Sequence, residues 1–256
     1  MQSSRERNVS LPRAISKLGV ASRKQAEEMI LSGRVTVNGL VLKNTSFRVD
    51  LREDKIKLDG EAIQKKKFIY LILNKPKGYV TTRSDELNRK TIYDLLKNVR
   101  EWVFPVGRLD KDTTGLLLLT NDNKLGEVLT NPKSPPDPLD HRASWRAGRI
   151  HKTYVAKINK PVDRLALEKL RSGVFIDEDL KTLPAKVNII NGTRTEIMLT
   201  IVEGKNRQVR RMFESLTYKV IELKRIQIGP ILLGNLELGC FRHLTKPEVE
   251  KLMEQK

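Results

Sequence analysis

The stretch FPVGRLDKDTTGLLLLTND, residues 104–122, places two acids in a loop directly before an apolar run. The acids are Asp110 and Asp112, and the run is the four leucines 116–119. Consecutive apolar residues beside a turn glycine, here Gly115, predict a buried strand. An acid in such a loop is usually a solvated surface residue, so a chemical role for either carboxylate needs support from the rest of the chain.

The composition predicts a soluble, cytoplasmic protein with a polyanionic partner. The 256 residues carry 49 lysines and arginines against 31 aspartates and glutamates, a formal net charge of +18, which favours nucleic acid as a partner. The start MQSSRERNVS has no apolar signal region, and FIYLIL and GLLLL are too short to cross a bilayer. One cysteine, Cys240, excludes an intrachain disulfide framework, and three histidines leave almost no ligands for zinc.

The first 63 residues predict a small domain of two short helices and a curled sheet. Ser22 and Gln25 have the spacing of a capping box at a helix start, and Gly33 supplies a stop. Alternating valines then lead to Asn38-Gly39, the preferred two-residue hairpin turn.

The motifs SRKQ and SGRVTVNG in this segment resemble the alpha-L RNA-binding motif of ribosomal small-subunit protein four, over about residues 11–60. In that family the basic helix face docks on folded RNA. The resemblance therefore implies RNA-backbone contacts for Arg13, Lys17, Arg23, Lys24 and Arg34. The alternative is that these side chains form the solvated face of a small domain.

The charged run QKKK at 64–67 predicts a linker, after which a second, larger domain is expected over 68–246. Strands are predicted at 68–74, 152–159, 183–190, 195–202 and 220–229, and helices at 162–172 and 205–216. Strands and helices do not alternate regularly, so the fold class is α+β with a mixed, mainly antiparallel sheet. Residues 132–149, with four prolines, predict an irregular insertion, and 247–256 a C-terminal helix.

A basic helix face near the end of this domain looks like the second half of a site that begins at GRLD. In KNRQVRRMFESL, residues 205–216, three arginines lie at helical spacing beside a buried stripe: Arg207, Arg210 and Arg211. A solvated basic face is the alternative interpretation of such a cluster.

The string Asp110-Lys111-Asp112-Thr113-Thr114 also imitates the D-x-D-x-T signature of haloacid-dehalogenase-like phosphohydrolases. Those enzymes use an aspartyl nucleophile with magnesium. Their signature follows a long apolar strand in a doubly wound sheet, whereas here the apolar run comes after the acids. The sequence therefore argues against a phosphohydrolase.

Four motifs in order, YLILNKPKGYVTT, GRLDKDTTGLLLLTND, HKTYVAKI and EGKNRQVRRMFE, resemble the RsuA-like family of ribosomal RNA pseudouridine synthases. The resemblance implies that Asp110 is the nucleophile, that Tyr154 and Arg210 complete the catalytic set, and that Arg108 fills the stack vacated by a flipped nucleotide. It implies no cofactor and no metal. Further RNA contacts are expected from Lys75, Lys77, Arg207 and Arg211. Asp112 has no counterpart in the family motif and keeps the surface interpretation.

The implied reaction breaks the N1–C1′ glycosidic bond, turns the uracil and rejoins it through C5, with no redox change. A carboxylate suits this chemistry because it can attack and later leave, at C1′ (or through a glycal intermediate) or at C6, and the sequence does not choose between these routes. The form of EGKNRQVRRMFE favours the large-subunit branch of the family over the small-subunit one. We expect a monomer without membrane contact. The alternative function is a ribosome-assembly factor that binds ribosomal RNA without catalysis.

Overall fold

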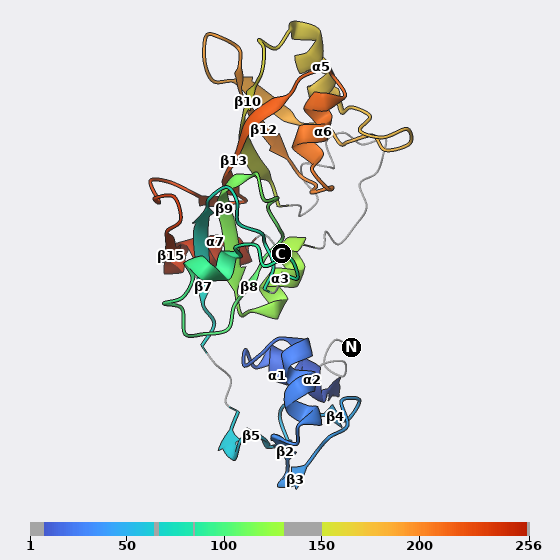
Figure 1. Cartoon of the computed structure of the whole chain (residues 1–256), viewed down its shortest axis with the longest axis vertical. Coiled ribbons are helices and arrows are strands. Elements are labelled where there is room, and N and C mark those ends of the chain that lie inside the picture. Colours follow the sequence, from blue (N-terminus) through green and yellow to red (C-terminus); the bar gives the residue numbers. More distant parts are fainter. Residues whose placement is uncertain (1–7, 64–66, 84, 131–149, 255–256) are drawn as a thin grey trace. The chain divides into compact units, whose positions relative to one another are not determined.

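The structure, a computed structural model, describes residues 8–63, 67–83, 85–130 and 150–254, and the chain divides into two compact units (Figure 1). The main run of the first unit ends at Ile69, and the unit also includes 98–104 and 120–123. The second unit comprises 70–97, 105–119 and the chain from Lys124 onward. Residues 64–66 of the predicted linker and the predicted insertion 132–149 lie outside the described residues.

The first unit contains two short helices, and the second helix has the start and stop that the sequence predicts. Helix α1 spans Leu11–Lys17 and α2 spans Arg23–Leu31. The Ser22 hydroxyl accepts from the Gln25 backbone N–H, and the Gln25 side chain accepts from the Ser22 N–H. This reciprocal pair satisfies two N–H groups that would otherwise be unpaired at the start of α2, so the predicted capping box is confirmed.

A four-stranded antiparallel sheet follows in the order β3-β2-β5-β6. Its strands are β2 (Val35–Val37), β3 (Leu40–Val41), β5 (Ile56–Leu58) and β6 (Glu61–Ala62). Asn38 and Gly39 connect β2 to β3 with positive φ angles of 52° and 87°, as a type I′ turn requires, which confirms the predicted hairpin. Strands β1 (Val9–Ser10) and β4 (Arg48–Val49) form a separate antiparallel pair.

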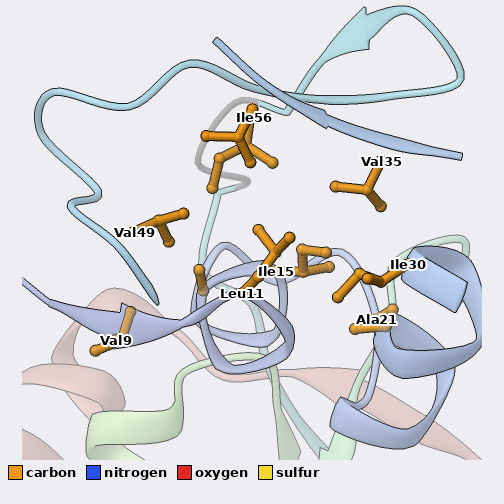
Figure 2. Packing of buried hydrophobic residues seen from close by; sticks show 11 residues of the cluster. Val9, Leu11, Ile15, Ala21, Ile30, Val35, Val49 and Ile56 are labelled. Atoms are coloured by element: carbon orange, nitrogen blue, oxygen red, sulfur yellow. The ribbon is translucent and has the colours of Figure 1, made fainter. Parts of the chain in front are cut away.

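The core of this unit joins the helices to both sheets (Figure 2). Leu11 and Ile15 of α1 lie at its centre, with Ile56 of β5 above them and Ile30 and Val35 on one side. These five side chains are at most 5% exposed. Full burial of such a side chain contributes roughly 1.5–3 kcal/mol, so this cluster gives the small unit its own source of stability.

The second unit is built on a nine-stranded sheet with the path β11-β12-β10-β13-β9-β7-β15 (Figure 1). The strands are β11 (Lys186–Ile189), β12 (Glu196–Ile201), β10 (Lys152–Ile158), β13 (Val220–Ile228), β9 (Thr114–Thr120), β7 (Tyr70–Lys75) and β15 (Phe241–His243). Two short strands, β14 (Ile231–Leu232) and β8 (Phe104–Pro105), pair with β13 and β9. The β13–β9 pairing is parallel, whereas β10–β12, β10–β13, β11–β12, β13–β14 and β7–β15 are antiparallel. The predicted mixed, mainly antiparallel α+β fold is confirmed.

The helices of this unit are short. They are α3 (Asn123–Thr130), α5 (Arg164–Ser172), α6 (Gln208–Glu214) and α7 (Lys246–Met253), with a 3₁₀ turn η1 at Ile92–Leu95. Helix α5 contacts β11 and α6 contacts β13. Helix α6 begins three residues later than predicted because its N-cap, Arg207, has a left-handed backbone with φ 47°. In the described parts of the chain, no helix has the length and apolar character needed to cross a bilayer.

The parallel contact between β9 and β13 depends on Gly115. Its φ is 101°, and a Cβ at this position would lie 2.2 Å from the Arg225 carbonyl oxygen. That separation is far inside van der Waals contact with backbone, which cannot move aside. Only glycine fits here, so the glycine after the loop acids sets the approach of two central strands.

Candidate active site

The loop that carries Asp110 connects β8 to β9 and is anchored by buried neighbours. Leu109 and Thr113 are 5% and 2% exposed, whereas Asp112 is exposed. The Thr113 N–H donates to the Asp110 carbonyl over 3.1 Å and closes a turn. Asp110 is half-buried, so the residue is partly accessible and a ligand can approach it. Asp112 has the surface placement that the sequence predicts for it.

Thr81 fixes the loop on the residue before Asp110. Its buried hydroxyl donates to the Leu109 carbonyl over 2.7 Å and accepts from the Leu109 N–H over 3.3 Å. One hydroxyl therefore satisfies both backbone groups of Leu109 that face it. Thr81 belongs to the YVTT end of the motif that begins with β7, so two distant sequence motifs meet at this bond.

Lys75 fixes the same loop on the other side of Asp110. Its ammonium donates to the carbonyls of Thr113 (2.9 Å), Pro76 (3.0 Å) and Lys111 (3.3 Å), and the side chain is fully buried. Burial lowers its pKa to about 8, although the charges of Asp110 and Asp112 act in the opposite direction. A buried ammonium bonded to three carbonyls is not accessible to RNA phosphates, so the predicted phosphate contact of Lys75 is wrong. Its position makes it an anchor of the loop.

Arg210 reaches the loop from α6. The guanidinium is 7% exposed and donates to the Val220 carbonyl through Nη1 (2.9 Å) and to the Asp112 carbonyl through Nη2 (3.1 Å). Burial and the charge of Arg207 lower its pKa, while the charges of Asp112 and Asp110 raise it. The predicted meeting of the RQVR helix with the RLD loop is present. Within the described residues, Arg210 bonds the loop backbone and makes no ion pair with the Asp110 carboxylate.

Tyr154 lies on β10 opposite Arg225 of β13, and both side chains are buried, at 9% and 4% exposed. Arg225 donates from Nε to the Leu116 carbonyl over 2.8 Å, and its Nη1 lies 3.5 Å from the Tyr154 hydroxyl oxygen. Residues paired across two strands point to the same face of a sheet. The tyrosine and this second arginine therefore share the face on which the Asp110 loop lies.

A cavity of about 1140 Å³ opens over these groups and is lined by Asp110, Tyr154, Arg225 and Thr81. Its volume exceeds the usual range of about 300–1,000 Å³ for small-molecule sites, so there is space for a nucleotide with its flanking phosphates. Several basic side chains also line it: Arg89, Arg108, Lys111, Lys152, Lys205 and Arg207. Four acids, Asp85, Glu86, Asp110 and Asp112, also line the cavity, but the basic side chains outnumber them, which favours a polyanionic ligand over a neutral one.

The remaining residues predicted to bind RNA have different placements in this unit. Arg108, Lys77 and Arg207 are exposed and can be reached by a large ligand. Arg211 instead donates to the Ile176 carbonyl and forms an ion pair with Asp177, at 2.7 and 2.9 Å, so its guanidinium already has protein partners.

In the first unit, Arg13, Arg23 and Lys24 are exposed on α1 and α2, and Lys17 is partly exposed. Arg34 is also exposed but forms a bidentate pair with Asp59, which raises the Arg34 pKa and lowers that of Asp59. The predicted basic helix face is therefore accessible, and its contact with RNA stays a prediction.

Sequence reasoning missed Thr81 and Arg225. The signal for Arg225 was available, because it lies two residues after Leu223 in a strand and so occupies the same inward face. A charge at an inward strand position is unusual and marks a candidate functional residue. No comparable signal marks Thr81, because a threonine beside a strand is common.

Comparison with known proteins gives a family for both units. The profile of the RNA pseudouridylate synthase family matches residues 69–215, and that of the S4 domain matches residues 9–56. The chain is 39% identical to ribosomal large subunit pseudouridine synthase B of Bacillus subtilis over 246 residues, 94% of each chain. It is 37% identical to an RNA pseudouridine synthase of Aquifex aeolicus over 250 residues, which cover 96% of this chain and 94% of the relative. The crystal structure of a pseudouridylate synthase matches 95% of this chain and 99% of its own, at 33% identity and a TM-score of 0.64.

These matches agree with the geometry of the second unit. The doubly wound parallel sheet of a haloacid-dehalogenase-like phosphohydrolase is absent from the described residues, and the leucine strand β9 follows Asp110. The Asp110 loop, the Tyr154 strand and the Arg210 helix instead meet at one cavity, and they come from the motifs that resemble the RsuA-like enzymes. The chain belongs to the RNA pseudouridylate synthase family and carries an S4 domain at its N-terminal side.

Proposed function

We propose that this enzyme isomerises a specific uridine of ribosomal RNA, in the large subunit, and that Asp110 is its nucleophile. One observation carries the assignment of Asp110. Three buried side chains from two distant segments, Lys75 and Thr81 from one and Arg210 from the other, bond the backbone on both sides of this residue. A surface loop without a function needs no such fixation, whereas a nucleophile gains from it because reaction rates depend steeply on alignment.

Ribosomal RNA as the substrate rests on two observations. The Bacillus subtilis relative, at 39% identity over nearly the whole chain, is named for the large ribosomal subunit. The first unit has an S4 domain with an accessible basic helix face, and the catalytic cavity is rimmed by cations. We place the enzyme in the cytoplasm, acting as a monomer on this RNA.

The chemistry follows from the residue types around the cavity. The Asp110 carboxylate acts at C1′, directly or through a glycal, or at C6, and the released uracil turns before C5 bonds to C1′. The C5 proton is lost and N1 gains one, so atoms balance without a redox partner. Tyr154 stacks on the base and relays a proton through its hydroxyl, and Arg210 keeps the loop aimed.

Access to the glycosidic bond requires the nucleotide to leave its stack, which costs a few kcal/mol. Arg108 is exposed, next to Leu109 and Asp110, so its guanidinium can enter the vacated space and stack on the neighbouring bases. Arg207 at the cavity and the exposed Lys77 contact backbone phosphates, and the S4 domain supplies the docking surface.

The test uses two neighbouring acids of one loop. Asp110→Asn keeps the shape of the side chain and removes its nucleophilicity, so it should abolish pseudouridine formation on large-subunit RNA with nearly unchanged RNA affinity. Asp112→Asn, the matched control, should stay near wild-type activity because its side chain is exposed and outside the family motif. Residual turnover of Asp110→Asn above about a tenth of wild type, a barrier change under roughly 1.4 kcal/mol, would refute the nucleophile assignment.

Pseudouridine assays also distinguish an enzyme from the assembly-factor alternative and identify the ribosomal subunit that carries the modified uridine. Pseudouridine mapping of both ribosomal RNAs from a strain lacking the gene should show one missing site in the large subunit. That site should return with the wild-type gene and stay absent with Asp110→Asn. An unchanged pseudouridine map, together with RNA binding by the purified protein, would support a non-catalytic binding protein.

A further inference from the structure

Arg225 is a buried cation for which the chemistry of the site, as described above, has no use. It is 4% exposed, and among the described residues no carboxylate pairs with it. Its Nη2 is buried without a hydrogen-bond partner. An unsatisfied buried donor destabilises the folded state, and an inward strand position of this kind normally holds an apolar residue. The chain therefore keeps a guanidinium where a hydrophobic side chain would be more stable, which is typical of functional positions.

The guanidinium is aimed at the tyrosine. Its Nη1 is 3.5 Å from the Tyr154 hydroxyl oxygen, and its central carbon is 6.0 Å from the centroid of the ring. An arginine has only donors, so the hydroxyl must accept from it, and the phenolic hydrogen is then directed away from Arg225. A separation of 3.5 Å is long for such a bond, as catalytic contacts often are before the substrate binds.

The same side chain is tied to the strand that follows the nucleophile. Its Nε donates to the carbonyl of Leu116 on β9, and Gly115 lies opposite Arg225 in the parallel β9–β13 register. The close approach at Gly115 leaves little freedom in this spacing. Arg225 is therefore fixed at one end to the strand after the Asp110 loop and reaches the tyrosine with the other.

We infer that Arg225 is a positioning residue that sets the direction of the Tyr154 hydroxyl relative to Asp110. The inference rests on the proposed function, because it acts through the proton-relay role of Tyr154. In this role Arg225 acts through Tyr154 and not on the reacting atoms. When it is present, the hydroxyl hydrogen is held on the side away from the guanidinium, and proton transfer starts from an aligned donor. Without it the hydroxyl rotates among several orientations.

A double-mutant cycle on the full-length protein tests this coupling. The variants are Arg225→Met, Tyr154→Phe and the pair, assayed by single-turnover pseudouridine formation on large-subunit RNA. Arg225→Met should slow the chemical step about tenfold with RNA affinity changed by less than about twofold. In the Tyr154→Phe background the same substitution should have no further effect. The control is Lys224→Met, which removes a neighbouring exposed charge from β13 and should leave the rate of the chemical step unchanged.

The melting temperature separates this role from a purely structural one, because replacing a residue that only stabilises the fold would lower it. Arg225→Met should melt close to the wild-type temperature, because removal of the unsatisfied Nη2 donor offsets the loss of the Nε bond to the Leu116 carbonyl. Arg225→Lys, with one nitrogen in place of the fork, should be intermediate in rate, and it replaces Arg225→Met in the cycle if that variant is unfolded by circular dichroism.

Three results would overturn the inference. They are a wild-type rate for Arg225→Met, rate reductions for Arg225 and Tyr154 that multiply in the double variant, and a wild-type rate for Tyr154→Phe. The proposed function fails by a different result, which is full pseudouridine formation by Asp110→Asn or absence of activity in the wild-type protein. The two failures are therefore distinguishable.

Discussion

Replacing Thr81 with valine should displace the nucleophile loop without touching the substrate. Valine keeps the shape of threonine but removes the hydroxyl that donates to the Leu109 carbonyl at 2.7 Å and accepts from the Leu109 N–H at 3.3 Å. Thr81 is 5% exposed and Leu109 is 5% exposed, so water has little access to either group once the hydroxyl is gone. Two buried backbone groups beside Asp110 are then left unpaired.

The size of the effect follows from these two bonds. An unsatisfied buried backbone group costs about 1–3 kcal/mol, and the longer of the two bonds contributes at the low end, so the free energy of unfolding should fall by about 2–3 kcal/mol. For a unit of this size that corresponds to a decrease of about 4–12 °C in melting temperature. If the loop relaxes by a fraction of an ångström to find new partners, the rate of the chemical step should fall about tenfold to a hundredfold.

The measurement pairs thermal unfolding with single-turnover pseudouridine formation, for Thr81→Val and for Thr81→Ser. Serine keeps the hydroxyl and lacks one methyl group, so it should retain most of the wild-type rate. Wild-type melting temperature and rate for Thr81→Val would refute the argument that this hydroxyl holds the Asp110 loop. An equal reduction in rate for Thr81→Ser would show that packing of the methyl group is responsible, and not the hydrogen bonds.

Three further predictions concern Lys75, Gly115 and the S4 domain. Burial lowers the pKa of Lys75 from 10.5 to about 8, so the unfolded chain binds this proton more tightly than the folded protein does. The free energy of unfolding of the wild type, relative to that of Lys75→Met, should therefore rise by on the order of 3 kcal/mol from pH 8 to 10.5. Urea denaturation measures it, and parallel pH profiles of the two proteins would contradict it. Gly115→Ala should yield little folded protein by circular dichroism, since its Cβ would meet the Arg225 carbonyl at 2.2 Å, whereas the open Gly204 should tolerate alanine. Removing residues 1–63 should weaken RNA binding and reduce the slope of log affinity against log salt by about 0.7–0.9 for each phosphate that the S4 domain neutralises. The folded truncated protein should still convert some uridine in a short RNA fragment. An unchanged slope in a salt titration would mean that the S4 domain does not contact phosphates.

Local sequence patterns were sufficient to predict the capping box and the hairpin of the first unit. The capping box at Ser22, the Asn38-Gly39 turn and the alternating valines all depend on contacts between residues that are close in sequence. Such contacts are specified by short-range backbone and side-chain preferences, so the sequence predicts them together with the ends of α2 and the turn between β2 and β3. The α+β class of the second unit could also be predicted, because the strand runs are apolar and bounded by turn residues.

The candidate site shows the limit of that reasoning. The motifs predicted that Asp110, Tyr154 and Arg210 belong together, and the structure brings the Asp110 loop, Tyr154 and the helix of Arg210 to one cavity. The motifs did not predict how they are held. A lysine in NKPKGY is expected at the surface, because nothing near it in the sequence shows that three carbonyls surround its ammonium. Two of those carbonyls, at Lys111 and Thr113, come from a loop 36 and 38 residues further along the chain.

The sequence by itself determined the family, the two-part organisation, the candidate nucleophile and the helix and hairpin ends of the small domain. Only the tertiary structure decided that Lys75 is an anchor and not a phosphate contact, that Arg211 pairs with Asp177, and that Arg225 lies against Tyr154. The physical reason is that the burial and partners of a charged side chain depend on strands brought together from distant segments. A charge is stable inside a protein only where such segments supply its hydrogen bonds, and the sequence does not show where they meet.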